Sequence, residues 1–352
     1  MYVTSVRIEN FRNLREVSIV PGQGINCLYG ANGAGKTSVL EALYLLGRGR
    51  SFRASSISPL IQDGASALRV VATCSKPDQR LGVERSASEW KGRIDQRSSS
   101  RISEFARAFP LVLVDPSNHE LIEGPPAGRR SFLDWGLFHV EPSYLDDWKR
   151  FSRLLRQRNA ALRSGADAAT LDALEAPMAR AAERVELMRA AYVEKLQRDV
   201  ALLLDELRFR LDPVELDYRP SANDAVQYLE RWRQSRARDL EHGFTREGPH
   251  RGELVVRCRQ RLAAPRLSRG QMKLTALLLK LAQMQRALDS GTRPLLLLDD
   301  PVSELDEAHL ESLLDWVSKQ PFQTWITAVE PIPADPVTLF HVEHGVIHSG
   351  NQ

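Results

Sequence analysis

Cysteine is scarce in this sequence: the 352 residues include three, Cys27, Cys74 and Cys258. Their odd number and wide spacing exclude a disulfide framework and a zinc site, and they indicate a reducing compartment. A dominant charge is also missing, because 48 Lys and Arg stand against 45 Asp and Glu, for a net charge of +3. This falls short of the strongly basic balance typical of nucleic-acid-binding chains, so any basic surface must be local.

Long apolar runs are missing too. The longest, such as residues 294–298, are far too short to cross a bilayer. The first residues, MYVTSVRIEN, lack the basic and apolar regions of a signal peptide. We therefore expect a cytoplasmic protein with no membrane partner. The hydrophobic content of 43% is enough for one large domain or two modest ones.

Hydrophobic periodicity predicts an α/β chain interrupted by a helical region. Residues 2–20 predict two strands with a turn near Arg12-Asn13, and a helix is expected from Lys36 to a stop at Gly47. An arginine-rich helical stretch, 143–165, and a second long helical stretch, 169–209, meet at a turn and predict an antiparallel hairpin, with Pro177 marking a kink or a late start. Further strands are expected at 24–30, 68–75, 79–86, 109–116, 252–262, 293–301, 322–329 and 338–347.

A glycine-rich turn between a predicted strand and a predicted helix matches the phosphate-loop pattern G-x-x-x-x-G-K-[ST] at every fixed position. Its backbone N–H groups suit a β-phosphate, Lys36 the β- and γ-phosphates, and Thr37 a magnesium ion. The motif predicts a nucleoside-triphosphate site. The residues assigned to it are Gly30, Ala31, Asn32, Gly33, Ala34, Gly35, Lys36, Thr37 and the following Ser38.

The segment PLLLLDDPVSELD is an apolar strand that ends in two acids. Asp299 is expected to hold Mg²⁺, and Asp300 stands where a general base or water-orienting residue belongs. Asp306, in the loop after it, is also assigned to the nucleotide site. The alternative is an ordinary strand that ends in an exposed acidic turn.

The phrase Leu267-Ser268-Arg269-Gly270-Gln271 stands directly before a strongly helical run. A serine hydroxyl, a glycine N–H and a helix N-terminus are all donors suited to an anion. The alternative is a plain serine cap on a core helix.

These three motifs, in this order, resemble ABC-type ATPases, whose signature L-S-G-G-Q in one head caps the γ-phosphate held by another head. The segments IENFRNL, GANGAGKTSVLEALYLLGRGRSFR, ELIEGPPAGRRSFLD, RQRNAALR, GPHRGEL and LSRGQMKL further resemble the RecF family, recombination mediators related to SMC heads. The resemblance implies an ABC-type P-loop ATPase head (1–115 and 245–352) with a mixed sheet, and a mainly helical second lobe (116–244) with a short antiparallel hairpin.

The same resemblance implies ATP and Mg²⁺ as cofactors, a homodimer with ATP, and slow DNA-stimulated hydrolysis that uses Lys36 and Asp300. It implies Ser268, Arg269, Gly270 and Gln271 as partner-side nucleotide contacts. It also implies binding at DNA gaps and junctions, work with RecO and RecR to load RecA, and support of DNA replication and the SOS response.

Three positions depart from the wider ABC pattern. Asp300 replaces the usual glutamate, which fits slow turnover, and Arg269 replaces a glycine. No histidine stands at the switch position in TWITAVE, where Thr327 or a neighbour falls.

Basic residues form local clusters that could neutralise phosphates without reading sequence. They are Lys149, Arg150, Arg153, Arg156 and Arg158, then Arg129 and Arg130, then Arg231, Arg233, Arg236 and Arg238. A solvated charged face is the alternative, so the DNA-contacting residues stay open. Arg12, Asn13 and Arg53 are expected near the phosphate loop, either on the nucleotide or in structural roles.

Two other function classes remain at this point. A transporter motor domain is permitted by the motifs, although the arginine-rich hairpin and missing histidine argue against it. The second is a binding module that uses ATP as a switch, with incidental hydrolysis; it overlaps with the ATP-dependent DNA-binding ATPase that the resemblance implies.

Overall fold

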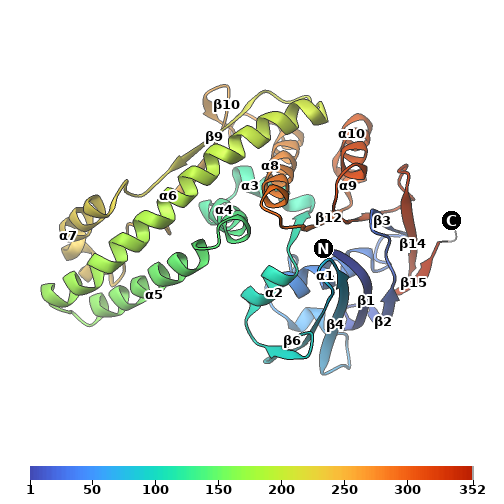
Figure 1. Cartoon of the computed structure of the whole chain (residues 1–352), viewed down its shortest axis with the longest axis horizontal. Coiled ribbons are helices and arrows are strands. Elements are labelled where there is room, and N and C mark those ends of the chain that lie inside the picture. The colour runs from blue at the N-terminus through green and yellow to red at the C-terminus, as the bar shows by residue number, and fades with distance from the viewer. Residues whose placement is uncertain (351–352) are drawn as a thin grey trace. The chain divides into compact units, whose positions relative to one another are not determined.

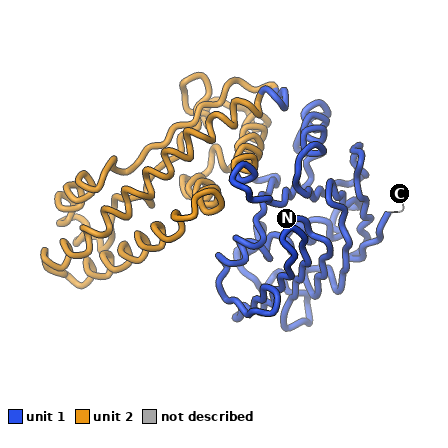
Figure 2. The backbone as a smooth tube through the Cα atoms, in the orientation of Figure 1, with its two compact units in different colours: residues 1–118, 205–209, 287–352 blue, residues 119–204, 210–286 orange. Residues whose placement is uncertain are grey.

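The computed structural model describes residues 1–350, which form two compact units (Figure 2). Unit 1 comprises residues 1–118, 205–209 and 287–352, and unit 2 comprises residues 119–204 and 210–286. The second unit is larger than the lobe expected over 116–244, because residues 245–286 cluster with the helical hairpin. The pairing of β10 (Glu253–Cys258) with β9 (Val214–Arg219) ties this segment to the hairpin side.

Unit 1 is built on two six-stranded sheets, in the orders β2-β1-β4-β5-β6-β7 and β15-β14-β3-β13-β12-β8. The first is antiparallel, while the second is parallel except for its edge strand β15. Its elements are β1 (Tyr2–Phe11), β2 (Leu14–Ile19), β3 (Ile25–Tyr29), α1 (Lys36–Arg48), η1 (Ser58–Leu60), β4 (Ala67–Ser75), β5 (Gln79–Ser86), β6 (Trp90–Ile94), β7 (Arg97–Ser99), α2 (Ile102–Ala108), β8 (Leu111–Val114), η2 (Pro116–His119), β12 (Leu295–Asp299), α9 (Pro301–Glu304), α10 (Glu307–Ser318), β13 (Thr324–Ala328), β14 (Val337–Glu343) and β15 (Val346–Ser349).

Helix α1 contacts strands of both sheets and lies in the main core of unit 1. Its buried leucines recur at helical spacing, so one helix supplies apolar surface to both layers. The predicted stop at Gly47 is wrong. The helix continues to Arg48, and Gly49 ends it with φ of 69°. Gly47 instead allows close packing, since a Cβ there would lie 2.5 Å from the Phe109 carbonyl oxygen.

Unit 2 is mainly helical, as expected, and Figure 1 shows α5 and α6 running side by side as a hairpin. Its elements are α3 (Glu120–Glu123), α4 (Pro126–Val140), α5 (Tyr144–Arg163), α6 (Ala168–Leu207), β9, α7 (Ala225–His242), β10, β11 (Arg261–Leu262) and α8 (Arg269–Asp289), of which the ends of α6 and α8 fall in unit 1. Pro177 lies inside α6 rather than at its start. Sequence patterns missed α4 and α7, and in unit 1 they missed β6 and β7.

One core cluster of unit 2 lies between α5, α6 and α7. It is a small cluster around Phe151, Met178, Tyr228 and Trp232, with alanines of α6 that allow the helices close approach. The hairpin's first helix, α5, has 20 residues and lies within the predicted stretch 143–165. Among the described residues, no helix is both long and apolar enough to cross a membrane.

Candidate nucleotide site

The phosphate loop joins β3 to α1, as the motif predicts. Three of its glycines, Gly30, Gly33 and Gly35, have positive φ values of 144°, 80° and 121°, which other residues rarely adopt. Lys36 is the first residue of α1, and its ammonium donates to the carbonyls of Gly30 (2.7 Å) and Ala31 (2.9 Å). The folded chain therefore holds the lysine against the loop that a phosphate would enter.

The acid that ends β12 meets the phosphate loop directly. Asp299 Oδ1 accepts hydrogen bonds from the Thr37 hydroxyl and the Thr327 hydroxyl, both at 2.8 Å. The strands β12, β13 and β3 are parallel neighbours, so their carboxyl ends share one edge of the sheet. Thr37 and Asp299, the two residues expected to hold metal, are thus brought together across 262 positions.

Burial raises the pKa of Asp299, while hydrogen bonds from Thr327 and Thr37 and the charge of Arg53 lower it in part. A cation beside the carboxylate would favour its charged form. A hydroxyl and a carboxylate are the hard oxygen ligands that Mg²⁺ accepts. Within residues 1–350, no group of three or more His, Cys, Asp or Glu side chains could hold a metal alone. Thr37 and Asp299 would supply two oxygen ligands, and phosphate and water oxygens would be needed for the others.

Asp300 has an unusual backbone and a partly unsatisfied carboxylate. Its φ and ψ are 53° and 51°, in the left-handed region, which aspartate tolerates better than most residues. Its Oδ2 accepts from the Ser303 hydroxyl at 2.7 Å, whereas its Oδ1 is buried with no hydrogen-bond partner in the described chain. Burial lowers the pKa of Lys36, and the charges of Asp300 and Asp299 oppose this shift. Asp300 therefore lies within electrostatic range of the phosphate-loop lysine.

Thr327 has a larger role than its sequence indicates. Besides donating to Asp299, its hydroxyl oxygen accepts from the Asp300 N–H at 2.9 Å. One buried threonine therefore orients both acids. Its strand register places it opposite Asp299. Knowledge of the strand pairing would have been needed to find this role.

Two of the residues expected near the loop have structural contacts. The Arg12 guanidinium donates to the buried Glu41 carboxylate, with one contact at 2.8 Å and a shorter one from Nε, and the Ser51 hydroxyl donates to the same carboxylate. Asn13 is hydrogen-bonded to the phosphate loop itself. Arg12 is thus already paired in the folded chain.

Ser268 begins α8 with a reciprocal cap. The Gln271 N–H donates to the Ser268 hydroxyl oxygen at 3.3 Å, and the Gln271 side-chain oxygen accepts from the Ser268 N–H at 2.9 Å. Ser268 therefore does cap α8, as the alternative interpretation holds. Ser268, Arg269 and Gly270 are nevertheless exposed, and a Cβ on Gly270 would meet nothing within 4 Å. The Ser268 hydroxyl keeps its proton to donate, and nothing within residues 1–350 lies close enough to require glycine at position 270.

Asp306 caps α10, a role its sequence did not indicate. Its carboxylate accepts from the His309 N–H at 3.0 Å and contacts His309 Nδ1 at 2.7 Å. Its assignment to the nucleotide site stays a prediction.

Several residues of the basic clusters are occupied inside the protein. Arg158 has a fully buried side chain that pairs with Glu175 and Asp239, so its grouping with a DNA-facing cluster is wrong. Arg129 pairs with Glu253 at 2.7 Å and also donates to the carbonyls of residues 121, 122 and 124. Helical spacing could not reveal this burial. The exposed members on α5 are Lys149, Arg150, Arg153 and Arg156.

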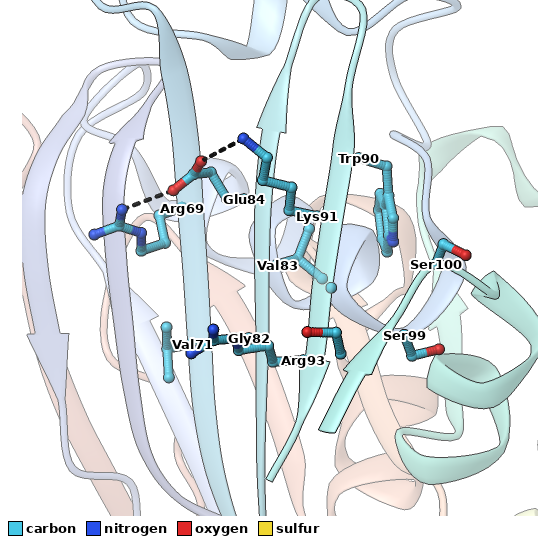
Figure 3. Close-up of a pocket in the computed structure, with 12 residues that line it drawn as sticks. Arg69, Val71, Gly82, Val83, Glu84, Trp90, Lys91, Arg93, Ser99 and Ser100 are labelled. Atoms are coloured by element: carbon cyan, nitrogen blue, oxygen red, sulfur yellow. Dashed lines mark hydrogen bonds and ion pairs between the residues drawn. The ribbon is translucent and has the colours of Figure 1, made fainter. Parts of the chain in front are cut away.

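A separate pocket of 660 Å³ lies on the antiparallel sheet of unit 1 (Figure 3). Figure 3 shows Glu84 between Arg69 and Lys91, with contacts of 2.7 and 3.9 Å. These pairs balance part of the charge of the pocket, and its other lining residues include Arg93, three serines, Trp90 and two valines. None of the residues assigned to the nucleotide site lines this pocket.

The phosphate loop, the acid-tipped parallel strand beside it and the capped helix of unit 2 define the class: an ABC-type P-loop ATPase head. The family model described as "RecF/RecN/SMC N terminal domain" matches residues 2–332. A DNA replication and repair protein RecF of Xanthomonas axonopodis pv. citri is 39% identical over 361 residues, covering 99% of this chain and 98% of that protein. Its counterpart in Thioalkalivibrio sulfidiphilus is 37% identical over the full length of both.

Solved structures agree. The recombination mediator protein RecF-ATP in the RecFOR pathway matches with a TM-score of 0.90 at 25% identity, over 99% of both chains. The Smc head domain of Pyrococcus furiosus matches with a TM-score of 0.59 at 16% identity, over 99% of this chain and 96% of that one, which supports the fold alone. The chain therefore belongs to the RecF family within the RecF/RecN/SMC group.

Proposed function

We propose that this protein is an ATP-dependent DNA-binding ATPase of recombinational repair. The observation that carries the proposal is the direct contact between Thr37 of the phosphate loop and Asp299 of the acidic strand, with Thr327 on the same carboxylate oxygen. A buried carboxylate shared by two hydroxyls is suited to a magnesium nucleotide. Similarity to a RecF that was solved with ATP supports the same nucleotide.

Each residue then has a chemical task. The loop N–H groups and Lys36 bind the phosphates. Thr37 and Asp299 would hold Mg²⁺, which would supply positive charge to neutralise the phosphate oxygens. The orphan Oδ1 of Asp300 accepts a proton from, or orients, the attacking water. Thr327 keeps both acids in place through its two hydrogen bonds.

The signature residues belong to the partner's site in this proposal. Ser268, Arg269 and Gly270 are exposed at the start of α8, so a second copy can approach them. A dimer that forms on ATP would close around DNA, and exposed cations of α5 such as Arg153 and Arg156 are candidates for contacting its phosphates. Hydrolysis would then open the dimer and act as a slow timer.

The finer parts of the proposal rest on family membership. They are binding at gaps and single-strand/double-strand junctions, cooperation with RecO and RecR in loading RecA, and support of DNA replication and the SOS response. They also include DNA-stimulated hydrolysis and a cytoplasmic location, where the chromosome is accessible.

Analytical ultracentrifugation with ATP, ADP or no nucleotide, each with and without gapped DNA, tests the proposal. We expect dimers with ATP and magnesium only. Lys36→Met should abolish nucleotide binding, and Ser268→Arg should bind ATP and stay monomeric. Asp300→Asn should hold ATP and remain on gapped DNA longer than the unaltered protein. Normal dimerisation of Ser268→Arg would exclude capping of the γ-phosphate by the partner's signature residues. Dimers that form equally with ATP, with ADP and without nucleotide would refute the ATP-dependent switch.

A further inference from the structure

Asn13 connects the turn between β1 and β2 to the phosphate loop. Its Nδ2 donates to the carbonyls of Gly33 (3.3 Å) and Ala34 (3.1 Å). Its Oδ1 accepts from the hydroxyl of Ser38, in the first turn of α1, at 3.0 Å. One side chain therefore fixes the loop relative to the helix that follows it.

A second turn, from the other end of the chain, reaches the same carbonyl. The N–H of Gly345, between β14 and β15, donates to Ala34 O at 2.8 Å. Gly345 has φ of 79°, and a Cβ there would overlap the Asn13 carbonyl oxygen. Two β-turns thus meet at Ala34, and glycine is required for their close approach.

The direction of one peptide group follows from these bonds. In a planar trans peptide the C=O and N–H groups point in opposite directions. The Ala34 carbonyl and the Gly35 N–H belong to the same peptide. Because Asn13 and Gly345 hold that carbonyl on one side, the Gly35 N–H must point to the other side. A Cβ at position 35 would lie 3.0 Å from Asn13 Nδ2, so the close approach of Asn13 to the loop also requires glycine there.

We propose that Asn13 and Gly345 are positioning residues that aim the Gly35 N–H at the phosphate site. The inference rests on the proposed nucleotide function and deepens it. Asn13 acts through the loop rather than by touching the nucleotide. Phosphate loops direct such N–H groups at the β-phosphate, which ATP and ADP share. Loss of Asn13 should therefore weaken the binding of ADP and of ATP by the same factor. Changes at residues that act through magnesium or the γ-phosphate should instead affect the two nucleotides differently.

Isothermal titration calorimetry on the full chain, with ADP and with ATP, tests this. Asn13→Ala should raise both dissociation constants about tenfold, the scale of one or two net hydrogen bonds. Asn13→Asp should raise them further, because it keeps the acceptor for Ser38 but places a negative charge against two carbonyls. In hydrolysis, KM should rise by a similar factor while kcat at saturating ATP changes less than twofold.

The exposed Arg15, two residues along the same hairpin, provides a matched control, and Arg15→Ala should bind like the unaltered protein. Ser38→Ala, which removes the hydroxyl that donates to Asn13 Oδ1, should weaken the binding of ADP and ATP by one smaller factor, and it covers the case in which Asn13→Ala unfolds. Unchanged ADP affinity in Asn13→Ala, or a loss confined to ATP, would overturn the inference. Failure of the unaltered protein to bind either nucleotide would instead overturn the proposed function, and this inference with it.

Discussion

Arg158 allows a sharp test of what holds the second unit together. Its side chain is fully buried on α5 and donates to Glu175 (3.0 Å), Asp239 (2.8 Å) and the Thr245 hydroxyl (2.8 Å). These partners lie on α6, on α7 and in the segment after α7, so one guanidinium connects three helices. Replacement by methionine keeps much of the volume and removes the charge and every donor.

The loss of stability in Arg158→Met depends on which carboxylate loses its partner. Glu175 keeps a second cation, Arg236, at 2.5 Å. Asp239 keeps only the Ser235 hydroxyl at 3.1 Å, and its Oδ1 already has no hydrogen-bond partner within residues 1–350. Removing one partner of a buried pair costs about 3–5 kcal/mol. At tenfold for each 1.4 kcal/mol, the opening equilibrium of the three helices should shift by roughly 100- to 4000-fold.

Hydrogen exchange followed by mass spectrometry measures this shift locally, so it does not require the two units to unfold together. Peptides from α5 and α7 should lose protection by that factor in Arg158→Met, while β12 and β13 should not change. Arg156→Met, on the same helix but exposed, is the control and should change protection by less than about 0.5 kcal/mol.

A rescue variant separates charge from packing. In the Arg158→Met background, Asp239→Asn removes the stranded charge and should restore much of the protection. The reasoning would be refuted if Arg158→Met behaved like Arg156→Met, or if Asp239→Asn made the loss deeper.

Three further predictions follow from single contacts. Burial first, then the charges of nearby arginines, lowers the pKa of His250 from 6.5 to about 4. Between these values the unfolded chain binds a proton that the native chain does not, so the free energy of unfolding should fall by up to about 3 kcal/mol as pH drops from 6.5 to 4. In His250→Gln, the urea concentration at the unfolding midpoint should vary less with pH over that window. Gly47→Ala should lower the melting temperature despite alanine's better helix propensity, because its Cβ would lie 2.5 Å from the Phe109 carbonyl oxygen, and an unchanged melting temperature would contradict that packing. Thr327→Val should cut steady-state ATP hydrolysis at least tenfold by releasing Asp299, whereas Thr327→Ser should retain it; equal rates in the two variants would exclude the orienting role.

The phosphate loop and the acidic end of the strand beside it could be predicted from the sequence because their patterns are local. The motif from Gly30 to Thr37 has its glycines, lysine and threonine at fixed positions between a strand and a helix. That pattern can be recognised from the sequence alone. The run of leucines before Asp299 likewise predicts a buried strand, which the structure contains as β12. The end of α1 could not be predicted, because Gly47 and Gly49 are equally good helix stops in the sequence. Packing against Phe109 accounts for Gly47, and Gly49 ends the helix.

By itself, then, the sequence determined the class of fold, the nucleotide motif and the order of its parts. The tertiary structure decided which side chains meet. Arg158 and Arg156 look alike along the chain, yet one is buried against two carboxylates and the other is exposed. Asn13 and Gly345 are 332 positions apart but bind the same carbonyl of the phosphate loop. The physical reason is that burial and pairing depend on contacts between distant segments, which neither spacing nor composition encodes.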